Sequence, residues 1–549
     1  MNSNKAATVL NRIFHICFFA CMAITVVGSL VFGYTKRVTS VNEAGKTVTV
    51  DVRYGAFVHM LIYGLAILLL ALFCALYYLS KKDIHFLRAS GKLSEEMKFR
   101  LITFGGIVLI LLLQLYFGAE LKIYPRTDLL QVVDGATGFA KTANFDAVRN
   151  DIATGNNNYM ARYPNNFMIM FMLALLYRVT YLILGYIPMY LSVVLNVIAI
   201  NLSLLFTVLI AKQMWGRRKA VFTLCLLFIF APFYVYVPFY YTDSLSMPFG
   251  ILGIYLFILG LKSTKDHRVR KYVLLAMSGA LLFIGFKVKG SIGVIFAAAI
   301  IYSLLKCKLK EFACVALALI LGFGSFALMF KADYNAVGLV TAEQAEMYEY
   351  PMTHWIMMGL KGRGGYNMAD SEYTSSFYSK EEKMDANLKV IEKRIKNLVK
   401  NHRLTYHFIF KAVWMWSDGT YFIPGHITDY VHRSWLHDFV LRDGKNYYML
   451  YGYSNAFQFF LLLMMALSLF KGVIKPKIDF MVLIKGSVFA LFLFLLIWEG
   501  RSRYLFNMTP LYILMAVDGI SYLTELLSKL KAKIKRRKSM PTEPTEATA

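Results

Sequence analysis

The sequence predicts an all-α polytopic membrane protein with about twelve transmembrane helices, interfacial helices on the outer side and an extracytoplasmic loop domain. Of the 549 residues, 58% are hydrophobic and 17% are charged, whereas soluble domains carry about 25% charged residues. The mean hydropathy is +0.52, and long apolar runs follow one another along the chain. This composition excludes a secreted enzyme, a disordered scaffold and a cytosolic nucleotide-binding protein.

Twelve apolar runs reach or approach the length needed to cross a bilayer, which is about 17–25 helical residues. The first run lacks a small-residue cleavage site before its polar flank, which indicates a retained anchor rather than a signal peptide. The predicted spans are residues 12–34, 56–80, 101–119, 187–211, 219–238, 245–261, 272–287, 291–305, 312–331, 454–470, 479–497 and 503–526.

Basic residues between these runs predict the orientation. Loop 262–271 holds five basic residues and one acid, loop 212–219 holds four and no acid, and segment 529–538 holds seven basic residues. Because basic loops stay in the cytoplasm, these three segments are predicted to face inward. Segments 120–165 and 332–452 are balanced, with five and fourteen residues of each sign, and are predicted to face outward. The net charge of +27 therefore reflects membrane orientation, and we expect no nucleic acid partner.

This orientation predicts five parts of the chain. Two N-terminal spans and a cytoplasmic loop come first, and a membrane core with a first outer loop follows. An extracytoplasmic loop domain, the C-terminal spans and a basic cytoplasmic tail complete the chain. Their residues are 1–100 for the N-terminal part, 101–331 for the core with its outer loop at 120–186, 332–452 for the loop domain, 453–528 for the C-terminal spans and 529–549 for the tail.

The run 167–184 is an exception among the apolar segments. Counting it as a span would place Arg217, Arg218 and the basic tail outside. The charge rule therefore favours a helix that lies at the outer interface or dips part-way into the membrane. The alternative, a thirteenth span that breaks the charge rule, stays open at this point.

Two further features describe the rest of the chain. Apolar residues recur every three or four positions from Met384 to Leu398, which predicts a helix over about 380–400 with one apolar face packed on the membrane-side core. The six cysteines lie in or beside apolar runs without a CxxC pair. They indicate buried or cytosolic thiols rather than disulfides or a metal site.

Charged residues gather at the predicted outer ends of the spans. A charge near hydrocarbon costs about 2.5–3.5 kcal/mol, so such a ring predicts a functional site, although any single Lys or Arg is explained as well by interfacial anchoring. Basic side chains bind phosphate oxygens, and a carboxylate can take the proton of a hydroxyl. The ring therefore predicts group transfer from a phosphorylated lipid. Its members are Asp128, Asp243, Lys287, Lys289, Glu499, Arg501 and Arg503.

Five segments carry a resemblance to a known family. They are Asp128 in the first long outer loop, RYPNN at 162–166, YYTDS at 240–244, WSDGT at 416–420 and GRSRY at 500–504. In their order and spacing the chain resembles the membrane-embedded glycosyltransferases of the GT-C superfamily, specifically bacterial relatives of the protein O-mannosyltransferases (glycosyltransferase family 39). The resemblance covers most of the chain from residue 100 onward. The first two spans lie outside it.

The resemblance implies a polyprenyl-phosphate-linked sugar as donor and an extracytoplasmic glycan, lipid or protein as acceptor. It makes Asp128 the catalytic carboxylate, with Asp134 as a weaker candidate. Many eukaryotic relatives have an Asp-Glu pair here, whereas Leu129 follows Asp128 in this chain. The sequence therefore does not indicate a divalent metal, although the resemblance is compatible with one. The substrate-binding candidates are Arg501, Arg503, Lys287, Lys289, Asp243, Arg162, Tyr163 and Asn165.

The sequence thus predicts a glycosyltransferase of the bacterial cytoplasmic membrane whose active site faces outside. The expected course is a single, inverting displacement at the anomeric carbon, with membrane lipid around the enzyme. The competing hypotheses are a lipid-linked glycan transporter or flippase and a non-catalytic membrane scaffold. A cavity that opens outward beneath 332–452 would favour the enzyme, and a cavity that can open on both sides would favour transport.

Overall fold

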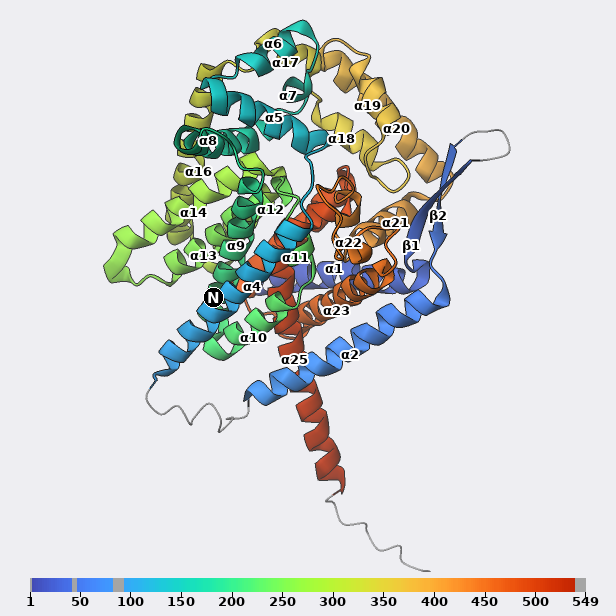
Figure 1. The fold of residues 1–549 in the computed structure, drawn as a ribbon. Coiled ribbons are helices and arrows are strands. Elements are labelled where there is room, and N and C mark those ends of the chain that lie inside the picture. Colours follow the sequence, from blue (N-terminus) through green and yellow to red (C-terminus); the bar gives the residue numbers. More distant parts are fainter. Residues whose placement is uncertain (1, 42–46, 82–92, 539–549) are drawn as a thin grey trace, which may run out of the picture.

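The structure is a computed structural model that describes residues 2–41, 47–81 and 93–538. Eleven of the described helices are long and apolar enough to cross a membrane, which confirms the predicted class (Figure 1). Ten of them coincide with predicted spans, and α8 is the eleventh. Their bounds are α1 Asn2–Phe32, α2 Ala56–Lys81, α4 Glu95–Glu120, α8 Phe167–Leu184, α9 Leu191–Trp215, α13 Met247–Lys262, α14 Arg268–Val288, α16 Leu309–Val337, α23 Tyr447–Ile474, α24 Phe480–Ile497 and α25 Thr509–Lys538.

Two predicted spans differ from these long helices. The prediction of one continuous helix over 219–238 is wrong, because two helices cover this segment. Helix α10 (Arg217–Phe228) ends early, and α11 (Pro232–Val235) follows it. Pro232 has no N–H and starts the new turn. The predicted span 291–305 is the 14-residue helix α15 (Gly293–Lys306). Ten long helices, the α10–α11 segment and α15 give the twelve predicted segments.

Polar side chains of neighbouring helices satisfy carbonyl groups in α11 and in the segment that follows it. Gln114 of α4 donates to the carbonyl oxygen of Phe233 at 2.8 Å, and Asn196 of α9 donates to that of Val237 at 2.8 Å. Asn201 of α9 in turn hydrogen-bonds Gln114. A broken helix inside a membrane is stable only where such partners satisfy its backbone.

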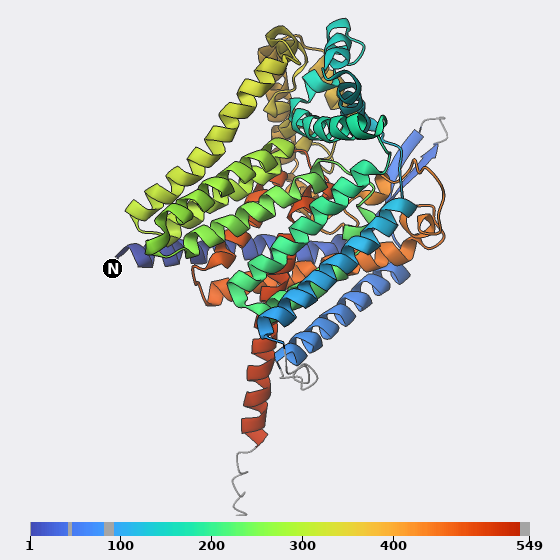
Figure 2. The ribbon, with the colours of Figure 1, turned by 60° about the vertical axis from the view of Figure 1, so that its left-hand side comes forward.

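Helix α8 lies across the end of the bundle. Its main neighbour is α5 (Thr127–Thr142) of the first outer loop, and Arg178 Nη1 donates to the carbonyl oxygen of Ala140 at 2.8 Å. Its residues Leu182 and Ile183 are exposed. Figure 2 shows it above the ends of the oblique long helices. This arrangement favours the predicted interfacial helix over a thirteenth span.

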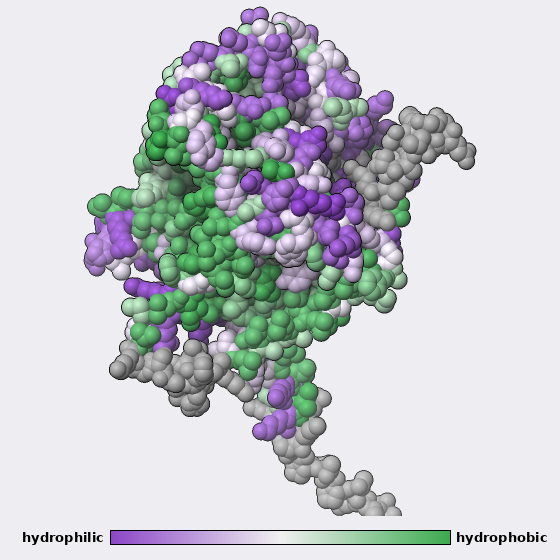
Figure 3. Space-filling view, in the orientation of Figure 1, coloured by the Kyte–Doolittle hydropathy of each residue, from purple (hydrophilic) through white to green (hydrophobic). Residues whose placement is uncertain are grey.

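The two ends of the bundle differ in structure. Most helices of the predicted outer segments form a cap at the top of Figure 1, and the C-terminal half of α25 extends from the opposite end. An apolar belt lies between a polar cap and a polar tail in the space-filling view (Figure 3). At the tail end, Glu96 pairs with Lys212 at 2.6 Å and Arg217 at 3.2 Å. Helix α25 continues through the predicted tail to Lys538, and 539–549 lie outside the described residues, as does most of the loop after α2.

The cap contains short helices and one strand pair. Strands β1 and β2 form an antiparallel hairpin between α1 and α2, which the sequence did not predict. The helix predicted over 380–400 is confirmed as α20, but Met384, Leu388 and Ile395 are 39–48% exposed. The expected packing of this face on the core is therefore wrong. The bounds are β1 Thr35–Val41, β2 Thr47–Arg53, α6 Asp146–Thr154, α7 Tyr159–Arg162, α12 Thr242–Leu245, α17 Ala342–Tyr348, α18 Met352–Gly359, α19 Met368–Ser375, α20 Lys380–Lys400, α21 Leu404–Trp416 and α22 His437–Val440.

Candidate functional site

Asp128 stands in the first turn of α5, on a backbone that two loops hold in place. Tyr124 N donates to the carbonyl oxygen of Asp429 at 2.8 Å, and Val431 N donates to that of Lys122 at 2.8 Å. Thr127 has φ +47°, a left-handed conformation that is strained for a β-branched residue. Such strain of about 1–3 kcal/mol persists where the surrounding structure imposes it, often at functional sites. The two loops therefore fix the place of Asp128.

The carboxylate of Asp128 faces a buried guanidinium group. Arg503 Nη2 lies 3.8 Å from Asp128 Oδ2, and the side chains are 13% and 43% exposed, respectively. The guanidinium carbon lies 5.7 Å from the ring centre of Tyr241 and 5.3 Å from that of Tyr504. The pair thus combines a carboxylate that solvent can reach with a cation that aromatic rings shield.

A second ion pair lies beside the first. Lys289 Nζ contacts Asp243 Oδ1, and the Asp243 side chain is fully buried. Among the described residues, no partner meets hydrogen-bonding geometry at Asp243 Oδ2. Lys289 Nζ also lies 4.5 Å from the ring centre of Tyr504. Tyr504 therefore borders both cations, and the buried Asp243 serves as the counter-charge of Lys289.

Glu499 links Tyr504 to Arg501. Tyr504 Oη donates to Glu499 Oε2 at 2.7 Å, and Arg501 Nε lies 4.0 Å from Glu499 Oε1. The guanidinium of Arg501 lies 5.1 Å from the ring centre of Phe422. Arg501 and Arg503 therefore face different surroundings, although the sequence placed them together.

His426 completes the surroundings of Arg503. Its ring stacks on Phe239 at 3.9 Å, and Arg503 Nη1 lies 3.4 Å from its Nε2. Burial and the nearby guanidinium groups hold the pKa of His426 well below its usual value. The imidazole is therefore neutral near pH 7 and accepts a hydrogen bond from Arg503. A lone histidine in a loop gave no signal in the sequence.

The remaining predicted residues lie at the edge of this cluster or outside it. Arg162 lies over the ring of Tyr350 at 5.4 Å, and Tyr163 packs on Tyr350 and Trp355 at 5.6 and 6.0 Å. Lys287 Nζ lies 4.7 Å from the ring centre of Phe330 on α16. These three side chains therefore contact the cap or the bundle wall rather than Asp128 or Asp243.

Within the RYPNN segment, the side chain that makes buried hydrogen bonds belongs to Asn166 and not to the predicted Asn165. Asn165 is exposed, whereas Asn166 is buried. Tyr241 Oη donates to Asn166 Oδ1 at 2.9 Å, and Asn166 Nδ2 donates to Tyr159 Oη at 2.8 Å. The chain of bonds leads from the rings beside Arg503 into the first outer loop. Tyr241 and Tyr504 stood within the quoted motifs, but nothing in the motifs distinguished them from their neighbours.

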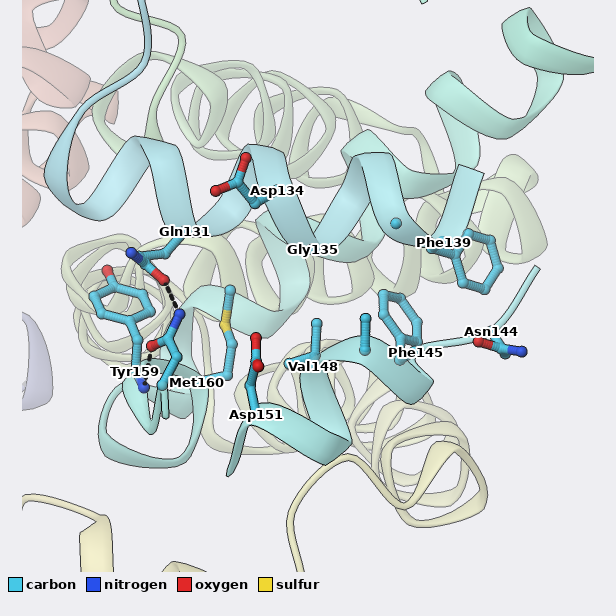
Figure 4. Close-up of a pocket in the computed structure, with 13 residues that line it drawn as sticks. Gln131, Asp134, Gly135, Phe139, Asn144, Phe145, Val148, Asp151, Tyr159 and Met160 are labelled. Atoms are coloured by element: carbon cyan, nitrogen blue, oxygen red, sulfur yellow. Dashed lines mark hydrogen bonds between the residues drawn. The ribbon is translucent and has the colours of Figure 1, made fainter. Parts of the chain in front are cut away.

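Asp134 lies in a separate small pocket. It stands on α5 and lines a cavity of about 150 Å³ together with Asp151 of α6, and Figure 4 shows its carboxylate turned away from Asp151. Asn157 donates to Gln131 there at 2.5 Å. Burial raises the pKa of Asp134. None of the contacts described for Asp128 involves this residue.

The carboxylates of the cluster do not form a metal-binding set. Asp128 faces Arg503, and Asp243 faces Lys289. Within the described ranges, no group of three or more His, Cys, Asp or Glu side chains could hold a metal ion. The residues present therefore do not fit a divalent cation, and we derive no step through one.

A family of conserved hypothetical integral membrane proteins matches residues 7–522. The chain belongs to this family. The match runs from α1 into α25 and includes every residue of the cluster. Membership in this integral membrane protein family agrees with the multi-pass helical fold. A comparison with curated proteins finds no match.

Two solved structures show a weak similarity to the chain. One is the archaeal oligosaccharyltransferase AglB from Archaeoglobus fulgidus in complex with an inhibitory peptide and a dolichol-phosphate, with 13% identity, a TM-score of 0.36 and coverage of 80% of this chain and 52% of that chain. The chain thus spans about half the length of that protein. The other is ArnT from Cupriavidus metallidurans bound to undecaprenyl phosphate, with 11% identity, a TM-score of 0.30 and coverage of 80% of each chain. These values are too low to support a conclusion about activity.

Proposed function

We propose that this protein is a GT-C-type membrane glycosyltransferase that transfers a sugar from a polyprenyl phosphate to an extracytoplasmic acceptor. The contact between Asp128 and Arg503 carries the proposal, because it joins a proton acceptor to a phosphate-binding cation. The acceptor is a glycan, lipid or protein. The order of the five sequence motifs supports the same function, and the protein is placed in the bacterial cytoplasmic membrane with this site facing outside.

In the proposed reaction an acceptor hydroxyl attacks the anomeric carbon of the donor sugar. The new C–O bond forms as the bond between that carbon and the phosphate oxygen breaks, which inverts the configuration. Asp128 takes the hydroxyl proton, and the electron pair of the broken bond leaves with the phosphate. Arg503 and Lys289 stabilise the negative charge that develops there.

The surrounding residues prepare these groups for the reaction. Asp243 is fully buried and holds Lys289 in place beside Tyr504. Tyr504 lies against both cations and is held by Glu499. Preorganised charges of this kind need little rearrangement during the reaction.

The competing transporter hypothesis requires a cavity that opens on both faces. The large cavity of about 620 Å³ in the described structure is lined by the cap and by the outer ends of spans. It lies beneath the loop domain, beside Arg501. This position favours the enzyme.

The proposal is tested by replacing the base without changing its volume. Asp128→Asn should lower the turnover about 10²- to 10⁴-fold, which is the contribution of general-base catalysis. The assay combines purified full-length protein, a polyprenyl-phosphate sugar and a membrane or wall fraction as acceptor source. Asp134→Asn is the matched control and should retain most of the activity, because Asp134 lies in a different pocket.

Two outcomes of this assay would contradict the assignment. If Asp128→Asn keeps near-normal turnover while Asp243→Asn abolishes it, the base is the carboxylate of the other ion pair. If neither change affects a measurable transfer, the carboxylate mechanism is wrong.

A further inference from the structure

The cavity beside Arg501 is lined by parts of the chain that have no role in the proposed reaction. Its volume is about 620 Å³, within the range of about 300–1,000 Å³ that is typical of small-molecule sites. The end of α1, the loop after α18, α21 and the start of α23 line it. Figure 1 shows α21, α22 and the β1–β2 hairpin at this corner of the molecule. The end of α1 and the segment that joins it to α2, which lie outside the family resemblance, thus supply part of its wall.

Two glycine-containing motifs of the loop domain meet at this cavity. In the sequence GRGGYN, Arg363 stands between Gly362 and Gly364, which have φ +57° and +75°. A side chain on Gly364 would also come within 2.4 Å of Lys411 Cε, so glycine is required there. Gly500 N donates to the carbonyl oxygen of Gly364 at 2.8 Å. This bond places Arg363 close to the segment that carries Arg501.

The second motif, WMWSDG, also lines the cavity. The guanidinium of Arg363 lies 5.4 Å from the ring centre of Trp414. Asp418 accepts from Thr420 and from Ser502 at 2.6 and 2.5 Å, which holds the turn that follows. The ring of Phe422 then lies between Arg442 and Arg501, at 5.5 and 5.1 Å from their guanidinium carbons.

The charge of the lining is strongly positive. Four basic residues line the cavity, and of the lining residues in the described chain only Asp418 is acidic. Lys361 is held by Asp370 at 3.0 Å, and the other three basic residues are Arg363, Arg442 and Arg501. Guanidinium groups bind phosphate and carboxylate with two parallel hydrogen bonds.

The rest of the lining suits a sugar. Most of its aromatic residues are tyrosines, which combine a flat apolar ring with a hydroxyl group. Such rings can stack on the apolar faces of sugar rings, while their hydroxyls bind the sugar's own. The tyrosines are Tyr34, Tyr54, Tyr366, Tyr447 and Tyr451.

We propose that this cavity binds an acceptor glycan that carries phosphate or carboxylate groups. The term acceptor rests on the proposed glycosyltransferase function, whereas the binding of an anionic glycan rests on the cavity itself. Arg501 borders the cavity and contacts Glu499, which hydrogen-bonds Tyr504 beside Arg503. These contacts connect the wall of the cavity to Arg503, which faces Asp128.

Isothermal titration of the purified full-length protein in a neutral detergent tests the proposal with three probes of similar size. They are maltotriose, maltotriose with one phosphorylated sugar, and trigalacturonate. We expect at least one anionic probe to bind about ten times more tightly than maltotriose, and its affinity to fall as salt is added. Binding of the phosphorylated probe alone or of trigalacturonate alone supports the proposal and identifies the anionic group.

Variants connect this binding to the cavity. Arg363→Gln combined with Arg442→Gln should weaken the anionic probe at least tenfold, whereas Arg403→Gln, at an exposed arginine of the same domain, should not. Gel filtration shows whether the double variant folds. If it does not fold, the preference of the unmodified protein for anionic over neutral probes decides whether the proposal holds. The proposal would be overturned if maltotriose binds as tightly as the anionic probes, or if neither anionic probe binds. It would also be overturned if a folded double variant keeps full affinity for the anionic probe.

Two controls distinguish the glycan site from a lipid site and from the catalytic carboxylate. Displacement of the anionic probe by phosphatidylglycerol at equal or lower concentration would overturn the proposal in favour of a lipid site. Asp128→Asn should bind the probe with unchanged affinity. If the unmodified protein binds anionic glycans but transfers no sugar from a series of polyprenyl-phosphate donors, the glycosyltransferase function fails while the anionic-glycan site stands.

Discussion

Arg503 and Lys289 both lie against the ring of Tyr504, and each faces its own carboxylate. The two ion pairs differ in exposure. The Asp128 side chain is 43% exposed, whereas that of Asp243 is fully buried. A proton acceptor must be reached by the substrate, so this difference assigns proton transfer to Asp128 in our proposal. Asp243 instead balances the charge of Lys289.

The structural role of Asp243 leads to a prediction about stability. Lys289→Met should destabilise the protein by about 3–5 kcal/mol, because removing one partner of a buried pair leaves an uncompensated charge. The double variant Asp243→Asn/Lys289→Met should recover much of this loss. Thermal unfolding of the full-length protein in detergent measures both effects.

Lys287→Met is the matched control, since Lys287 lies in the last turn of α14, two residues before Lys289, but its side chain lies over the ring of Phe330. Its effect should be clearly smaller. A Lys289→Met variant as stable as the unmodified protein, or a double variant less stable than the single one, would show that Asp243 does not depend on Lys289.

Hydropathy alone does not show whether α8 spans the membrane, and its packing gives further information. Its length and composition would allow it to cross a membrane, but its buried side faces α5 of the outer loop. The α10–α11 segment shows the opposite case, because two short pieces replace one long helix and Gln114 and Asn196 satisfy the exposed carbonyls. Apolar length alone therefore does not show how either segment packs.

The position of α8 can be tested by labelling its two ends. In a cysteine-free background, Asn165→Cys and Tyr186→Cys should both react with an impermeant thiol reagent in intact cells. A helix at the outer interface keeps both ends outside, whereas a spanning helix places them on opposite sides. Labelling of only one of the two positions would show that α8 crosses the membrane.

At the scale of the whole molecule, the apolar runs predicted ten long helices and their order. The signal was strong because each run approaches the thickness of the hydrocarbon core. The β1–β2 hairpin and the exposed face of α20 were not predicted, because they depend on tertiary contacts. The hydropathy pattern carries no information about those contacts.

The candidate site was predictable in part. Asp128, Arg503, Asp243 and Lys289 lie together as their common level at the span ends indicated. Lys287 and Arg162 point elsewhere, and His426 enters from a distant loop. Side-chain direction at a span end depends on a rotation of about 100° per residue, so a shift of one or two positions changes the neighbours completely.

The orientation of the whole chain is a separate prediction. Thr264→Cys should be protected from an impermeant reagent in intact cells, and Ser375→Cys should be labelled, because basic loops remain in the cytoplasm. Both positions are exposed in the structure, so burial would not account for a difference in labelling. Labelling of Thr264→Cys in intact cells would reverse the topology.

The central claim is that Arg503 and Lys289 hold a lipid phosphate next to Asp128. The most direct measurement is a cryo-electron microscopy structure of the Asp128→Asn variant with undecaprenyl phosphate. We predict that phosphate oxygens lie about 2.7–3.2 Å from the nitrogen atoms of both basic residues, with residue 128 facing the same space. A phosphate bound between Arg363 and Arg442, or at the end of the bundle near Glu96, would contradict the account.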